Sequence, residues 1–136
     1  MVKTLLLLWG LMFAASAIAD DSEFTLSKIC RAGVATNYGR EISSIQALQI
    51  DINIIRINYE RPEDNHKFIF LCRQQGTSRL NLLDESLTGA RWYGSDLADK
   101  QTLFSKKDNV LIIRLVNNGI LESEVFFREK DFTTKR

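Results

Sequence analysis

The chain has 136 residues, with 18 lysine and arginine residues against 17 aspartate and glutamate residues, and a formal net charge of +1. A chain of this length accommodates one small domain. Its near-balanced charge provides no electrostatic attraction for nucleic acid or an anionic membrane, so we expect neither as a partner.

The first nineteen residues are typical of a secretory signal peptide. Met1–Thr4 is a short cationic start, Leu5–Ala15 is an almost unbroken apolar run, and Ala17–Ala19 is a small-x-small cleavage site. The apolar run is too short to cross a bilayer, and no stop-transfer segment follows it. We therefore expect residues 1–19 to be removed and residues 20–136 to form the mature protein, with no stable membrane anchor.

The mature chain would be balanced in charge and free of lipid. Removing 19 of the 136 residues leaves 117, and because the leader holds one charged residue, Lys3, these carry 17 basic and 17 acidic side chains. Asp20 follows the cleavage site, where a bacterial lipoprotein would need a cysteine. The brevity and alanine-rich end of the leader suit a bacterium. We expect a periplasmic or secreted protein.

Two cysteines, Cys30 and Cys72, remain in the mature chain. In an oxidising compartment the expectation is one disulfide between them. Chain-entropy arguments give a bridge closing a loop of about 40 residues roughly 4 kcal/mol, a large share of the roughly 5–15 kcal/mol margin of a small domain. The competing interpretation is two free thiols, one of them catalytic, but the chain has no C-x-x-C motif.

Residues 24–39 have the signals of a helix. The hydroxyl of Thr25 can cap its N-terminus, and Gly39 provides the left-handed residue that ends a helix. Phe24 and Ile29 can form a hydrophobic staple. One stripe at helical spacing contains Leu26, Ile29, Cys30 and Gly33. The glycine in this stripe would allow close approach to a sheet, and the cysteine would face a strand.

The rest of the chain is predicted to form short strands. Apolar and polar residues alternate over Leu48–Ile54 and again, in the opposite phase, over Ile55–Tyr59. The change of phase at the Ile54-Ile55 pair indicates either a bulge or a strand buried on both faces from there on. Further strands are expected around Phe68–Cys72, Leu80–Leu82, Gly89–Tyr93 and Thr102–Phe104.

The last hairpin has the clearest signal. Asn118-Gly119 predicts a two-residue turn, because a type I′ turn needs positive φ at both positions. Counting outward gives four pairs on one face, namely Val116–Leu121, Arg114–Ser123, Ile112–Val125 and Val110–Phe127. Since three of these pairs are apolar, we predict that this face lies in the core.

One helix followed by six or seven strands is an α+β arrangement. We expect the N-terminal helix to pack on a strongly curved antiparallel meander sheet, with the Cys30–Cys72 disulfide pinning the helix to a strand. A helix-free β-sandwich is the alternative. No linker or repeat appears, so residues 20–136 are expected to form a single α+β domain.

Motifs for enzymatic chemistry are sparse. His66 stands alone, so a zinc site or a Ser-His-Asp triad lacks its partners. No G-x-S-x-G, P-loop or G-x-G-x-x-G motif is present, and we expect no cofactor and no metal. Carboxylate-only hydrolysis needs two acids facing a cleft. The acids that could come together for it are Asp84, Glu85, Asp96 and Asp99.

The segment Gly89–Gly94 is the best candidate for a binding site. Arg91, Trp92 and Tyr93 belong to residue types that anchor protein interfaces. Arg91 and Trp92 point in opposite directions in an extended segment, so at most one of them faces the core. The simpler interpretation places Trp92 in the core. Five arginines allow either a basic patch or, as we favour, a mixed solvated surface: Arg31, Arg40, Arg73, Arg79 and Arg91.

Four segments together resemble a group of small exported bacterial proteins of unassigned function. They are a C-R-A-type helix (Ile29–Ala35 with Gly39-Arg40), a Y-x-R-P turn (Ile57–Pro62), a second cysteine in a strand (Phe70–Arg73) and a G-R-W-like element (Gly89–Trp92). The resemblance implies this fold and the disulfide, and no catalytic residues. More weakly, Ser86–Tyr93 is similar to a Ser/Gly-rich segment of periplasmic inhibitors of C-type lysozyme.

These observations predict an exported binding module of the bacterial envelope that acts by contact with a protein partner still to be identified. The binding residues would be Trp92, Arg91 and Tyr93. An inhibitor of an envelope-attacking enzyme such as lysozyme and a carboxylate-dependent hydrolase are the alternatives.

Overall fold

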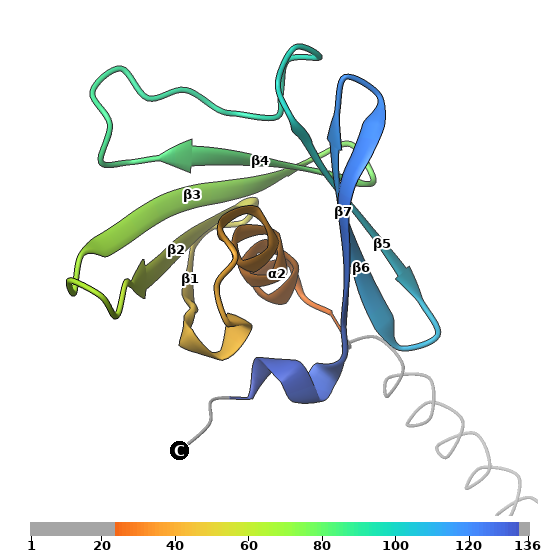
Figure 1. Cartoon of the computed structure of the whole chain (residues 1–136), viewed down its shortest axis with the longest axis horizontal. Helices are drawn as coiled ribbons and strands as arrows, with labels where there is room; N and C mark the ends of the chain where they lie inside the picture. The colour runs from red at the N-terminus through yellow and green to blue at the C-terminus, as the bar shows by residue number, and fades with distance from the viewer. Residues whose placement is uncertain (1–23, 134–136) are drawn as a thin grey trace, which may run out of the picture.

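The computed structural model describes residues 24–133, so the predicted signal peptide and its cleavage site lie outside the described residues. Within this range one long helix, α2 (Leu26–Tyr38), is followed by a seven-stranded antiparallel sheet (Figure 1). The strands lie in chain order: β1 Gln46–Asp51, β2 Ile54–Glu60, β3 Lys67–Gln75, β4 Arg79–Asp84, β5 Gln101–Lys107, β6 Val110–Asn117 and β7 Ile120–Phe127. This open meander confirms the α+β prediction and excludes the helix-free sandwich. Within residues 24–133, no helix has the length and apolar character needed to span a membrane.

Helix α2 begins and ends where the capping residues Thr25 and Gly39 predict. The Oγ1 of Thr25 accepts a hydrogen bond from the N–H of Lys28 at 3.3 Å. Gly39 follows the last turn with φ 63°. A Cβ atom on Gly33 would lie 2.7 Å from Cδ1 of the fully buried Leu80. The helix therefore approaches the sheet closely at this glycine, as the sequence predicted.

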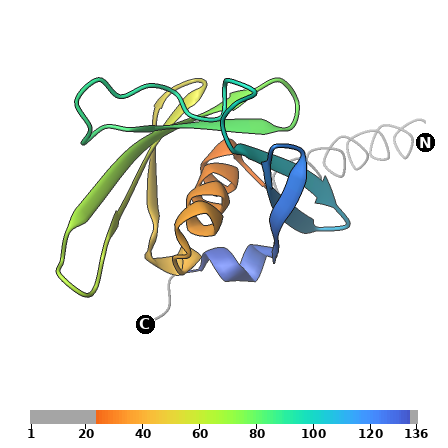
Figure 2. The same ribbon diagram turned by 45° about the horizontal axis from the view of Figure 1, so that its top comes forward.

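The sheet curls around α2, which fills an open half-barrel. Figures 1 and 2 show β1–β4 on one side of α2 and β5–β7 on the other, and α2 contacts strands of both groups. The division lies between β4 and β5, which pair only at Arg79 with Leu103 and at Leu80 with Thr102. Beyond these pairs the two strands separate, and the loop that joins them occupies the gap.

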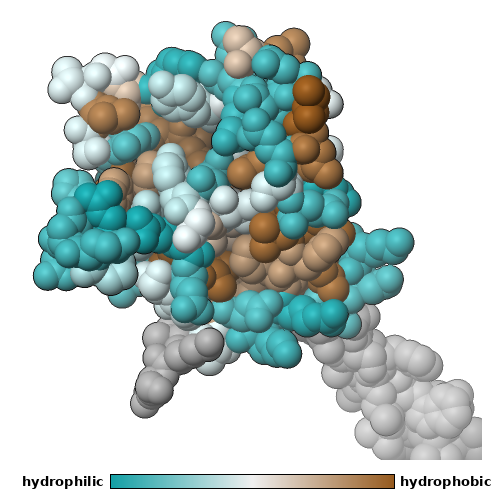
Figure 3. Space-filling model, viewed as in Figure 1, coloured by the Kyte–Doolittle hydropathy of each residue, from teal (hydrophilic) through white to brown (hydrophobic). Residues whose placement is uncertain are grey.

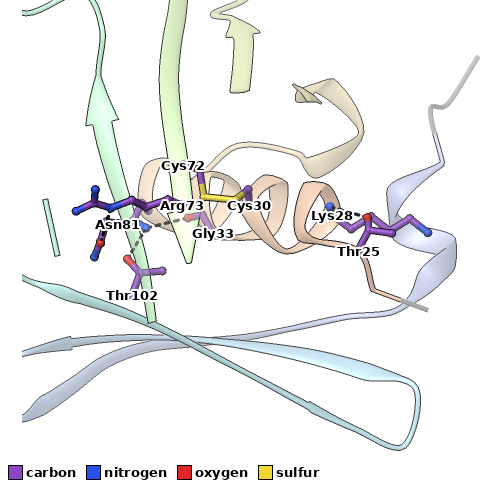
Figure 4. Close-up of a disulfide and its surroundings, with 9 residues drawn as sticks. Thr25, Lys28, Cys30, Gly33, Cys72, Arg73, Asn81 and Thr102 are labelled. Atoms are coloured by element: carbon purple, nitrogen blue, oxygen red, sulfur yellow. Dashed lines mark hydrogen bonds between the residues drawn. A yellow bond between two sulfur atoms is a disulfide. The ribbon is translucent and has the colours of Figure 1, made fainter. Parts of the chain in front are cut away.

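A disulfide between Cys30 and Cys72 joins α2 to β3, which confirms the predicted bond (Figure 4). Both residues are fully buried, and their Cα atoms are 6.0 Å apart. Since the chain has two cysteines and both are in this bond, the interpretation with free thiols is wrong. The bond fixes the helix against the β1–β4 half of the sheet.

The segment of residues 129–132 packs against the first turns of α2. Two short 3-10 helices lie there, η1 (Ile42–Ser44) and η2 (Glu129–Phe132). The ring of Phe132 lies 6.0 Å from that of Phe24 and 6.1 Å from that of Phe127, measured between centroids. Arg31 donates from Nη2 to the carbonyls of Ile42 at 3.0 Å and Phe132 at 3.2 Å. This helix residue therefore links both short helices to the core.

The apolar alternation over residues 48–59 belongs to two strands rather than one. β1 ends at Asp51 and β2 begins at Ile54, so the phase change reflects a hairpin turn. The alternative of a strand buried on both faces is wrong, because every second residue of β2 is only half-buried. A register shift does occur at the Ile54-Ile55 pair, but the extra residue, Ile50, is in β1, between Gln49 and Asp51, which pair with Ile55 and Ile54. The apolar residues expected on one face of this strand are exposed, at 61 and 42 % for Leu48 and Ile50 of β1 and at 79 % for Ile52 in the turn. β1 is an edge strand, and these side chains point away from the core.

The predicted turn at Asn118-Gly119 is confirmed, but the strand pairing predicted beyond it is wrong. Both residues have positive φ, and Val116 pairs with Leu121 as predicted. A bulge then leaves Glu122 unpaired, so that the next pairs are Leu115–Ser123, Arg114–Glu124 and Ile113–Val125. The shift pairs Val125 and Phe127 with Ile113 and Leu111, which lie on the opposite face of β6 from Ile112 and Val110 because the side-chain period of a strand is two. The buried residues of β6 are therefore Leu111, Ile113 and Leu115, not the predicted Val110, Ile112, Arg114 and Val116. On β7 the predicted Phe127 is buried and the predicted Val125 packs against the core.

Candidate functional site

The loop of residues 85–100, which we call the 85–100 loop, joins β4 to β5 and is anchored at Tyr93. The N–H of Tyr93 donates to the carbonyl of Leu82 at 2.7 Å, and the N–H of Leu82 donates to the carbonyl of Tyr93 at 3.0 Å. This isolated antiparallel bridge stands where β5 has separated from β4. The expected strand over Gly89–Tyr93 is thus wrong, since one bridged residue takes its place.

Tyr93 and Trp92 lie on opposite faces of the sheet. Directly paired residues share a face, so Tyr93 lies with the buried Leu82 on the helix side and Trp92 lies outside. There the guanidinium of Arg73 is 4.2 Å from the centroid of the Trp92 ring. Arg73 also donates from Nε to Oδ1 of the fully buried Asn81 at 3.1 Å (Figure 4). Trp92 is half-buried outside the core cluster, so the interpretation of Trp92 as a core residue is wrong.

Arg91 closes the base of the loop. Its guanidinium donates two hydrogen bonds to the carboxylate of Asp99, at 2.6 and 3.0 Å, and lies 4.2 Å from the centroid of the Tyr93 ring. The Asp99 side chain is 8 % exposed and also accepts from the N–H of Gly94 at 3.1 Å. The hydrogen bond from Arg91 lowers the pKa of Asp99 to about 2. Arg91 thus orients Tyr93 while its own side chain stays half-exposed.

Acid should open the base of the loop. A carboxylate with a lowered pKa stabilises the folded state above its ordinary pKa, here 3.8, and loses that effect as the pH falls towards about 2. We expect the NMR signals of the Arg91 guanidinium and the Tyr93 ring to change between pH 4 and pH 2. Asp99→Asn should show the released signals already at pH 7. If Asp99→Asn retained the wild-type signals, the ion pair would have no role in placing Tyr93.

A pocket of about 280 Å³ opens beside the 85–100 loop at the C-terminal end of α2, and we call it the mouth pocket. Its lining includes Asn37 and Tyr38 from α2, Phe70 and Asp84 from β3 and β4, and Tyr93 and Lys100 from the loop. In the space-filling view, apolar side chains form separate patches among polar ones, including one under the loop that follows β4 (Figure 3). The pocket therefore brings together the end of α2, β3 and the continuous stretch from β4 through the 85–100 loop.

Tyr38 forms one aromatic wall of the mouth pocket. Its ring stacks on that of Phe70, with centroids 4.8 Å apart and an interplanar angle of 27°. Partial burial, followed by the charge of Asp84, raises the pKa of Tyr38 to about 12, so the phenol remains a hydrogen-bond donor at neutral pH. The adjacent Asn37 donates from Nδ2 to Oγ1 of the buried Thr102 at 3.0 Å. This bond ties the end of the helix to β5.

The acids considered for hydrolysis are not gathered in the mouth pocket. Asp84 is the member of this set that lines it. The others have separate partners: Glu85 pairs with Arg56 at 2.9 Å, Asp96 accepts from the N–H of Ala98 at 3.1 Å, and Asp99 binds Arg91. His66 lies apart, at the turn between β2 and β3, with its ring 4.6 Å from that of Phe68. Residues 24–133 contain no cluster of three or more His, Cys, Asp or Glu side chains suited to a metal.

The five arginines considered as a basic patch lie on different elements. Arg31, Arg73 and Arg91 bind the partners given above, and Arg79 begins β4. The guanidinium of Arg40 lies 5.6 Å from the centroid of the Tyr59 ring. Arg31, Arg40, Arg73 and Arg91 thus each contact different groups.

The sequence identified part of the 85–100 loop as a candidate binding site, but it did not identify Tyr38 and Lys100 as residues of the site. Tyr38 is the last residue of α2 and lies off the buried helical stripe, which is the signal that could have identified it. An aromatic side chain at such a position does not pack along the helix and is free to form the wall of a pocket. Nothing local in the sequence indicates that Lys100 lies near it.

Comparisons with protein families, with curated proteins and with solved structures yield no match for this chain. Its function has to be argued from the geometry of the site.

Proposed function

We propose that this protein is an exported binding module of the bacterial envelope, acting by protein–protein contact through the mouth pocket and the 85–100 loop. The leader sequence supports export. The Cys30–Cys72 disulfide supports an oxidising compartment, because such bonds are rare in the reducing cytosol. After cleavage the protein would act in the periplasm or outside the cell.

Two half-exposed tyrosines on a fixed frame are the observation that carries this proposal. Tyr38 is 45 % exposed and Tyr93 is 52 % exposed, and both line the mouth pocket. The backbone bridge to Leu82 fixes Tyr93, and the stack on Phe70 fixes Tyr38. Aromatic side chains that are ordered before binding lose little conformational entropy on association, and tyrosine is enriched among residues that dominate binding energy.

The three binding residues suggested by the sequence take different roles in this proposal. Tyr93 contacts the partner, and Arg91 both orients Tyr93 and remains exposed enough to reach the partner. Trp92 supports the loop from the outer face through Arg73. We therefore expect Trp92→Ala to affect binding through the position of the loop rather than through a lost contact.

Tyr93→Ala should abolish capture of the partner. In a pull-down from periplasmic extract or culture medium, immobilised mature protein is expected to retain a partner that Tyr93→Ala loses. Truncation of a tyrosine that anchors an interface costs at least about 2 kcal/mol, which is roughly a thirtyfold loss of affinity. Ile52→Ala is the control, because Ile52 is more exposed, at 79 %, and does not line the mouth pocket. If wild type and Tyr93→Ala recovered the same proteins, this surface would not be the binding site.

An inhibitor of an envelope-attacking enzyme is the second candidate, and the exposed tip of the loop favours it. Residues 85–89 are exposed, and among them Leu87, at 55 %, also lines the mouth pocket. A loop that projects beside a binding surface suits insertion into the cleft of an enzyme. Addition of the protein to a muramidase assay should then slow lysis, and Leu87→Ala should relieve the effect. Unchanged lysis at a large molar excess would exclude inhibition of that enzyme.

A further inference from the structure

The mouth pocket has the dimensions of a site for one side chain. Its volume is about 280 Å³, at the lower limit of the roughly 300–1,000 Å³ of pockets that enclose a whole small molecule. The pocket is therefore suited to an anchor residue that projects from a larger partner. Its chemistry indicates which residue that is.

The walls of the pocket combine aromatic rings with a carboxylate. Tyr38 is stacked on Phe70 on one side only and is otherwise half-exposed, and Tyr93 stands on the other wall. Asp84 lies between strand and loop, and its Oδ1 accepts from the N–H and the hydroxyl of Ser86 at 3.0 and 2.6 Å. Aromatic faces beside a carboxylate form the usual environment for a bound ammonium or guanidinium group.

The uncompensated charge of the pocket is negative. Within residues 24–133 Asp84 forms no ion pair, and its hydrogen bonds from Ser86 are uncharged. Lys100, the basic residue of the lining, is paired with Glu122 at 3.3 Å. Arg91 is likewise paired with Asp99. A cation entering the pocket would therefore meet one free carboxylate, whereas an anion would have to displace Glu122 from Lys100.

We infer that the mouth pocket binds a lysine or arginine side chain of the protein partner, with Asp84 as the counter-ion and Tyr38 and Tyr93 as aromatic walls. This inference rests on the proposed function and specifies the anchor residue of the partner. The cation keeps its charge and no bond is made or broken, so the interaction should weaken as the salt concentration rises.

The probes are blocked amino acids titrated into the oxidised mature protein and followed by NMR. Nα-acetyl-lysine amide and Nα-acetyl-arginine amide should shift the ring signals of Tyr38 and Tyr93, whereas Nα-acetyl-norleucine amide, which has no charge, should not. Asp84→Asn keeps the shape of the side chain and should weaken binding of the basic probes roughly tenfold, the loss of about one charge-assisted contact. Asp51→Asn is the matched control, because Asp51 also accepts a backbone N–H, from Ile52, but does not line the pocket.

Equal shifts with the norleucine probe, or unchanged binding to Asp84→Asn, would overturn this inference. The proposed function fails separately. Partner capture that depends on Tyr93 but survives Asp84→Asn would uphold the binding module and reject the basic anchor. Conversely, specific binding of the basic probes without capture of any protein would uphold a cation site and reject the protein-binding role.

Discussion

Replacing both Cys30 and Cys72 by alanine should lower the free energy of unfolding by about 3–5 kcal/mol. The two residues are 42 positions apart, so the bond removes a large loop from the unfolded chain, and both positions are fully buried, so the truncation also leaves space in the core. For a domain of this size the melting temperature should fall by roughly 12–20 °C. Urea unfolding of the mature protein, monitored by circular dichroism, measures the change.

Reduction of the wild-type protein separates the effect of the lost cross-link from the effect of the space left in the core. It breaks the cross-link but keeps both sulfur atoms in place, so reduced wild type should be more stable than the double alanine variant and less stable than the oxidised protein. The intact mass of the mature chain should be lower than that of its reduced form by two hydrogens. Free labelling of both thiols without denaturant, or equal stability of all three forms, would contradict a structural disulfide.

The helix could be predicted because its signals are local. Thr25 caps its first turn, Gly39 adopts the left-handed conformation that ends it, and the stripe that contains Cys30 faces the sheet. Each of these features depends on residues within four positions of one another, and the fold did not override them. The disulfide could be predicted because the two cysteines of the chain allow one pairing and because the leader sequence predicts an oxidising compartment.

The sheet was harder to predict, because the alternation of apolar and polar residues shows which side chains share a face. It does not show where one strand ends and the chain reverses. Over residues 48–59 a reversal of phase is produced by a turn, and the sequence there lacks the Gly or Asn-Gly signal of a tight hairpin. The turn between β6 and β7 was predicted correctly, but the bulge at Glu122 shifts the pairing of the two strands by one residue from there on. A single unpaired residue in β7 is enough to pair Val125 and Phe127 with the opposite face of β6, and no local rule predicts its position.

The candidate site could be predicted only in part, because it is assembled by tertiary structure. Arg91, Trp92 and Tyr93 were recognisable as residue types that bind, and the sequence indicated that neighbours in an extended segment point opposite ways. Tyr38 and Asp84 join Tyr93 only because β5 separates from β4 and leaves a gap that the 85–100 loop enters. That separation is a property of the curved sheet rather than of any one segment.

Gly94→Ala should lower the free energy of unfolding by about 2–4 kcal/mol, against about 1 kcal/mol for Gly89→Ala. Both glycines belong to the 85–100 loop and have positive φ, 90° and 71° respectively. A Cβ atom on Gly94 would lie 2.9 Å from the carbonyl oxygen of Leu80, whereas a Cβ on Gly89 would meet nothing within 4 Å. Leu80 cannot retreat, because its backbone lies between β3 and β5 in the sheet. Urea unfolding of the two variants beside the wild type measures both changes.

Both variants place an alanine at a position with positive φ, so both include that conformational cost. The difference between them therefore measures the close contact of the Gly94 position with the carbonyl oxygen of Leu80. Because Gly94 follows Tyr93 and donates its N–H to Asp99, its displacement should also move the Tyr93 ring and weaken capture of the partner. Gly89→Ala should change neither the position of the Tyr93 ring nor capture of the partner. Gly89 lies outside the backbone bridge between Leu82 and Tyr93 and outside the Arg91–Asp99 ion pair. Equal destabilisation by the two substitutions would mean that the 85–100 loop is not held against β4, and the frame on which the binding surface depends would then be absent.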